Sequence, residues 1–167
     1  MDGYEFKRII ENKKPRYSAK YKEFVEIISL KGDKSGRGNV STFGAYYQTF
    51  MYAYIVGLRI GKKEYLSPDE DKVDFAPISN WKPSGVRDFI LMTLMNRCKE
   101  FKTPWQWLTL EDATEENLNN FAIEIMRELE AYANVGLAYL KDKWDTERIM
   151  FNNPFVFIQI LDELEDC

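Results

Sequence analysis

The chain has 167 residues and a mass of 19.7 kDa, which is the usual size of one domain. It contains no histidine, so catalytic pairs, metal sites and proton shuttles that need an imidazole are excluded. Two cysteines, Cys98 and Cys167, are too few for a disulfide framework or for a zinc site built without histidine. The net charge of −4 is uneven: residues 1–40 carry ten basic and six acidic side chains, whereas residues 101–167 carry five and fourteen.

No secretory signal is expected, because the first residues lack an apolar stretch. The most apolar segment, Phe43–Leu58, is shorter than the ~20 residues that span a bilayer. These features predict a cytoplasmic protein that forms a single helical domain over residues 1–167. Residues 1–16 could form a flexible basic segment ahead of the helices.

The first half of the chain predicts two helices. Residues 18–30 place Tyr21, Phe24, Val25 and Ile28 on one face, although the run around Phe24 also fits a strand. Residues 43–60 follow a cap at Ser41 or Thr42 and end at Gly61. This second segment is apolar on nearly all sides, so we expect it to be the buried centre of the fold.

The second half predicts three more helices. One is capped by Ser84 and faces inward with Val86, Phe89, Ile90, Leu94 and Cys98. The longest begins at Thr114, which caps it, and could bend or break near Gly136. The last is capped by Asn153, has Pro154 at its first position and contains the apolar residues Phe155, Ile158, Leu161 and Leu164, with a strand over 155–160 as the alternative. The sequence therefore predicts a mostly α bundle of about five helices, in which a minor strand element could occur.

Three tryptophans are the candidate partner-binding residues. Trp105 and Trp107 lie close together outside the periodic segments, and Trp81 lies beside Pro83. Tryptophan is enriched in the energetically dominant part of protein interfaces. Burial against the helices is the structural alternative, since most tryptophan side chains are largely buried.

A basic segment supports a second hypothesis, nucleic-acid binding. Its candidate phosphate contacts are Lys13, Lys14, Arg16, Lys20, Lys34 and Arg37. The glycine-containing loop around Lys34 does not match a Walker motif. The acidic isoelectric point of about 5.1 counts against this hypothesis, and solvated lysines are the simpler interpretation.

An acidic cluster supports a third hypothesis, a metal-dependent nuclease-like enzyme. Asp69, Glu70, Asp71 and Asp74 offer the oxygen ligands that Mg²⁺ and Ca²⁺ prefer. Glu70-Asp71-Lys72 has the Glu-x-Lys form of many metal-dependent nucleases, but no glycine completes an EF-hand loop. A hydrated acidic turn is the favoured interpretation, because runs of charge in turns are usually solvated.

Residues 42–63 resemble a signature of small accessory proteins associated with bacterial DNA phosphorothioation (Dnd-type) and related defence gene clusters. The resemblance is carried by Tyr46-Tyr47, Phe50-Met51, Ala53, Gly57 and Gly61-Lys62-Lys63. It implies an accessory role in a nucleic-acid-handling or defence assembly. The missing imidazoles, the uneven charge and the Trp105/Trp107 segment favour a non-enzymatic protein without a cofactor that binds a protein partner.

Overall fold

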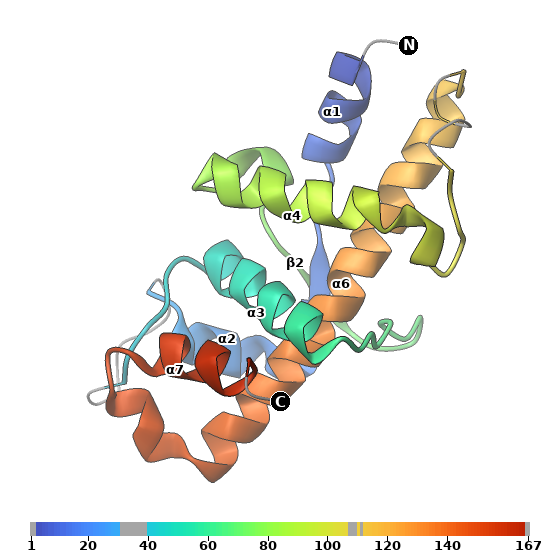
Figure 1. The fold of residues 1–167 in the computed structure, drawn as a ribbon. Coiled ribbons are helices and arrows are strands. Elements are labelled where there is room, and N and C mark those ends of the chain that lie inside the picture. Colours follow the sequence, from blue (N-terminus) through green and yellow to red (C-terminus); the bar gives the residue numbers. More distant parts are fainter. Residues whose placement is uncertain (1–2, 31–39, 107–109, 111, 166–167) are drawn as a thin grey trace. The chain divides into compact units, whose positions relative to one another are not determined.

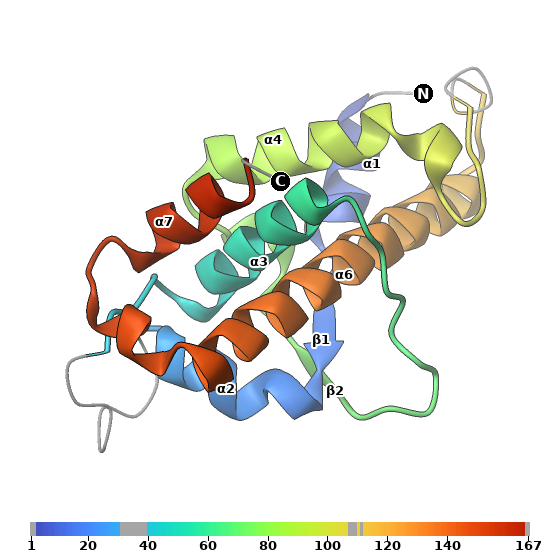
Figure 2. The same ribbon diagram turned by 60° about the horizontal axis from the view of Figure 1, so that its bottom comes forward.

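Helices make up most of the computed structural model, which describes residues 3–30, 40–106, 110 and 112–165 (Figure 1). Its α-helices are α1 (Gly3–Glu11), α2 (Lys22–Ile28), α3 (Tyr46–Ile60), α4 (Ser84–Asn96), α6 (Glu115–Thr146) and α7 (Val156–Glu163). Four short 3₁₀ helices are η1 (Ala19–Tyr21), η2 (Ile78–Asn80), η3 (Cys98–Glu100) and η4 (Arg148–Asn152). Two strands, β1 (Arg16–Ser18) and β2 (Lys72–Asp74), pair in a small sheet, as Figure 2 shows. The prediction of a mostly α fold with a minor strand element is therefore confirmed.

The chain divides into two compact units. Unit 1 comprises the chain as far as Arg16 together with Asp74–Glu130, and unit 2 comprises Tyr17–Val73 together with the chain from Ala131 onward. Helix α6 contributes its first half to unit 1 and its second half to unit 2. Neither unit is therefore a continuous segment of the sequence.

Helix α1 is an element that the sequence analysis did not predict. Its Phe6 ring stacks on Phe121 of α6, with the ring centroids 5.5 Å apart. Lys13, just after α1, donates a hydrogen bond to Asn119. These contacts tie the basic N-terminal segment to the rest of unit 1.

The centre of unit 2 is a close crossing of α3 and α6. A Cβ atom on Gly57 would overlap the backbone carbonyl of Tyr132, and one on Gly136 would overlap that of Ala53. Each helix thus places a glycine against the backbone of the other helix. Any side chain at either position would increase the distance between the two helices. The expected break near Gly136 is wrong, because α6 is continuous there and its glycine serves this packing.

Helix α3 also confirms the prediction of a buried, aromatic-rich helix. Thr49–Tyr54 are all buried, and Gly61 ends the helix in the left-handed conformation at φ 73°. The hydroxyl of Tyr52 donates a hydrogen bond to the carbonyl oxygen of Phe157 at 2.6 Å. The helix begins later than predicted, because Gln48 accepts the N–H of Ala45 and takes the capping role assigned to Ser41 or Thr42.

The other predicted helices differ from the structure at their ends and faces. The expected helix over 18–30 is divided among β1, η1 and the shorter α2. Thr114 does cap α6, since its hydroxyl accepts the N–H of Asn117 at 3.3 Å. The predicted caps Ser84 and Asn153 are wrong, because Pro83 and Phe155 hold the cap positions of α4 and α7. Asn153 instead accepts the N–H of Phe155 at 2.9 Å ahead of α7. The alternative of a strand is wrong, since Val156–Glu163 is helical. Helix α7 buries Val156, Phe157 and Ile160, whereas Phe155 and Ile158 are exposed.

Buried tyrosines give unit 2 a stability that should depend on alkaline pH. Burial, reinforced by the negative charge of Glu26, raises the pKa of Tyr17 to about 12 from its usual 10. The protonated phenol is then favoured in the folded chain, so its contribution is complete below pH 10 and lost between pH 10 and about 12. Because of Tyr17, we expect the free energy of unfolding of wild type to be about 1 kcal/mol lower at pH 11 than at pH 9. Urea unfolding at both pH values measures this loss. Tyr17→Phe should lose correspondingly less, and equal losses in the two chains would contradict the assignment.

Candidate functional site

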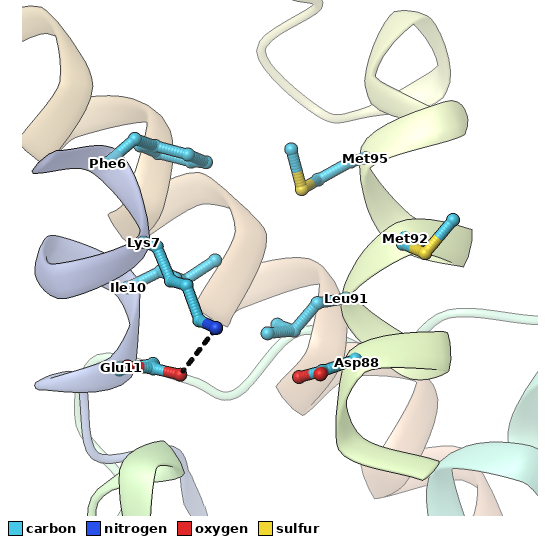
Figure 3. A pocket seen from close by; sticks show the side chains of 8 residues that line it. All are labelled: Phe6, Lys7, Ile10, Glu11, Asp88, Leu91, Met92 and Met95. Atoms are coloured by element: carbon cyan, nitrogen blue, oxygen red, sulfur yellow. Dashed lines mark ion pairs between the residues drawn. The ribbon is translucent and has the colours of Figure 1, made fainter. Parts of the chain in front are cut away.

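A groove lies between α1 and α4 on the surface of unit 1 (Figure 3). It has a volume of about 280 Å³. Its apolar lining consists of Phe6 and Ile10 from α1 and of Leu91, Met92 and Met95 from α4. Two methionines among these residues give the lining an adaptable shape, because the unbranched thioether side chain repacks easily. We call this feature the α1–α4 groove.

Charged side chains form one end of the α1–α4 groove. Glu11 lies between two cations, with Lys7 Nζ 3.8 Å and Arg87 Nη2 3.3 Å from its Oε1 atom. Arg87 Nε also lies 2.7 Å from Asp88 Oδ1. We call these four side chains the rim. The guanidinium of Arg87 is largely buried, so the chain of ion pairs fixes α1 to the start of α4.

An exposed apolar stripe runs along α4 beside the groove. Val86, Phe89 and Met92 follow one another at intervals of three residues, and Phe89 and Met92 are 61% and 63% exposed. The prediction that Val86 and Phe89 face inward is therefore wrong, although Ile90, Leu94 and Cys98 are buried as expected. Helix α4 is apolar on two sides, and the spacing of its residues cannot show which side the chain itself covers.

The candidate tryptophans do not form a partner surface in the described residues. Trp81 is 1% exposed, and its indole N–H donates a hydrogen bond to the carbonyl oxygen of Ala76 at 2.9 Å. Its assignment as a partner contact is wrong, because the ring is part of the interior. Trp105 is half-buried and packs on Phe121 with ring centroids 5.1 Å apart. Trp107 lies outside the described residues.

The candidate nucleic-acid residues have contacts within the chain where the structure describes them. Lys13 binds Asn119, and Arg16 binds the buried carboxylate of Glu130 through its backbone N–H at 2.8 Å and its Nε at 3.3 Å. Lys20 lies over the ring of Tyr21, with its Nζ atom 4.9 Å from the centroid. Lys14 is exposed. Lys34 and Arg37 lie outside the described residues.

The acidic cluster forms a turn rather than a cation site. Glu70 accepts the backbone N–H of Ser67 at 2.6 Å, and a hydrogen bond from the Ser18 hydroxyl is the main cause that lowers the pKa of Glu70. Lys72 Nζ donates to the carbonyl oxygens of Pro68 and Glu70. Within the described ranges, no three or more Asp, Glu or Cys side chains form a group that could hold a metal ion. The alternative metal site at Asp69, Glu70, Asp71 and Asp74 is therefore not supported.

Buried carboxylates on α6 are a feature that sequence reasoning missed. Glu124, Glu128 and Glu130 are all buried, and Glu128 Oε1 accepts the backbone N–H of Lys102 at 3.0 Å. With Glu130 bound to Arg16, two of these acids anchor chain segments from other parts of unit 1 to α6. The sequence contains no signal of this role, because the glutamates bind backbone N–H groups that are far away in the chain.

Comparison with known proteins gives no relative for this chain. No family model, no curated protein and no solved structure matches it. In the part of the chain that the structure describes, no helix is both long enough and apolar enough to cross a membrane.

Proposed function

We propose that this chain is a non-enzymatic interaction protein that binds a protein partner through the α1–α4 groove and the apolar stripe beside it. The observation that carries the proposal is the exposure of Met92 in the lining of an apolar hollow, with Phe89 exposed three residues earlier on the same helix. Contiguous apolar surface of this kind, bordered by charged residues, is typical of protein-binding sites. A groove between two helices also suits the apolar face of a helix from a partner.

The chemistry of the rim supports a protein partner over a nucleic acid. Its two cations and two carboxylates are already paired with one another, so the rim lacks the excess positive charge that phosphate binding requires. The hollow itself is lined by apolar side chains, which favours burial of a hydrophobic face. The absence of histidine from the sequence is in keeping with a binding role.

The resemblance of residues 42–63 extends the proposal to an accessory protein of a bacterial assembly, in the cytoplasm and related to defence. Its residues belong largely to α3 and the turn after it, which form part of unit 2. The α1–α4 groove belongs to unit 1. The proposed binding surface is thus independent of the segment that carries the resemblance.

A photo-crosslinking amino acid placed at Met92 tests the proposed surface in cells. We expect a discrete adduct with protein, because a partner bound in the groove would lie within reach of this side chain. The same amino acid at Ile149, which is 85% exposed in unit 2, is the matched control. Phe89→Glu should remove the Met92 adduct. An adduct pattern at position 92 identical to that at position 149 would contradict the proposal.

A further inference from the structure

The more exposed charged side chain on each wall of the α1–α4 groove is opposite in sign to that on the other wall. Lys7 lies on α1 and Asp88 on α4, and Figure 3 shows both at the same end of the hollow. Their side chains remain 58% and 47% exposed, although each has an ion-pair partner within the chain. With Glu11 and Arg87 the rim has equal numbers of positive and negative charges. This surface therefore has no net charge that would repel an identical surface.

Two-fold symmetry would place Lys7 and Asp88 of one copy opposite side chains of the other copy with the opposite charge. In a dimer of identical chains, the same patch on each copy must fit itself. If the two-fold axis runs along the groove, α1 of each copy lies against α4 of the other. Lys7 of one copy then approaches Asp88 of the other, and the contact occurs twice. Met92 of both copies, which lines the groove, also becomes covered.

We infer that the occupant of the α1–α4 groove is a second copy of this chain, held in a two-fold symmetric dimer. The inference rests on the proposed function, because it names the partner of the same surface. It depends on charge complementarity between the two walls, together with the apolar stripe that a second copy would cover. The methionines of the lining can adjust to each other's shape across the axis.

Sedimentation velocity of the purified chain over a range of concentrations tests the dimer. We expect wild type to be a dimer and Met92→Glu to weaken self-association about 100-fold, because a carboxylate would be buried in an apolar interface. Ile149→Glu, on an exposed apolar residue of unit 2, should leave the dimer unchanged. Circular dichroism of each variant serves as the control for folding, and we expect spectra like that of wild type. A wild-type monomer, or a dimer that Met92→Glu does not weaken, would overturn the inference.

Two charge reversals test the contact between copies directly. In a dimer of Lys7→Glu chains, the introduced carboxylate faces Asp88 of the other copy. In a dimer of Asp88→Lys chains, the introduced ammonium faces Lys7 of the other copy. Like charges therefore meet in both dimers, and each variant alone should associate about tenfold more weakly than wild type.

Mixing the two variants should restore association. Of the two contacts in the mixed dimer, one joins the two introduced charges and the other joins the native Lys7 and Asp88, so each pairs a cation with a carboxylate. We therefore expect a heterodimer of wild-type affinity. Failure of the mixture to associate more tightly than either variant alone would refute the two-fold contact.

The outcomes separate this inference from the proposed function. A monomeric chain whose position-92 crosslinker still forms a discrete adduct with another protein would refute the dimer and keep the interaction surface. A dimer whose adduct has twice the mass of the chain supports both statements. A monomer without any discrete adduct refutes both.

Discussion

Gly136→Ala is expected to lower the free energy of unfolding by about 3 kcal/mol or more. The added Cβ would overlap the carbonyl of Ala53, a backbone atom that cannot rotate away. Helices α3 and α6 would have to separate, which would loosen the contacts on both sides of the crossing. Urea unfolding monitored by circular dichroism measures the loss.

Gly85→Ala is the matched control for this prediction. Gly85 also lies within a helix, but a Cβ added there would meet nothing within 4 Å. Because alanine is the better helix former, we expect this variant to be unchanged or more stable by up to about 1 kcal/mol. Similar losses for Gly85→Ala and Gly136→Ala would show that close helix packing is not the cause.

Trp81→Ala is expected to lower the free energy of unfolding by about 3–5 kcal/mol. The substitution empties the space of a fully buried indole and leaves the carbonyl of Ala76 without its donor. Trp81→Phe retains most of the ring volume and should lose less, which isolates the hydrogen bond from the packing. A loss below about 1 kcal/mol for Trp81→Ala would contradict its place in the interior.

Local signals in the sequence predicted where helices end better than they predicted which residues pack against other helices. Gly61 and Thr114 each act where predicted, because capping depends on residues adjacent in the chain. The caps predicted at Ser84 and Asn153 are wrong, since Pro83 and Phe155 hold those positions. Gly136 was misinterpreted as a weak point of its helix. Its function depends on Ala53, a residue of another helix that no local pattern identifies.

The candidate site could not be predicted for a related reason. The spacing in α4 predicted Ile90 and Leu94 as buried but assigned Phe89 to the same face. Helix α1 was missed although Phe6, Ile9 and Ile10 recur at helical spacing, and one wall of the groove was missed with it. The indole of Trp81 was assigned to binding because composition alone does not distinguish an interface residue from an interior one.

The packing of the N-terminal segment on α6, which is distant in the sequence, has a consequence for synthesis of the chain on the ribosome. Lys13 and its partner Asn119 are 106 residues apart, so the N-terminal helix emerges long before the residues it packs against. The contact between the N-terminal segment and α6 cannot form until Asn119 has been synthesised. Packing of α1 must therefore wait until most of the polypeptide is complete. Neither half of the gene would encode a separately folding piece, and nascent chains truncated before residue 119 should remain sensitive to protease at their N-terminus.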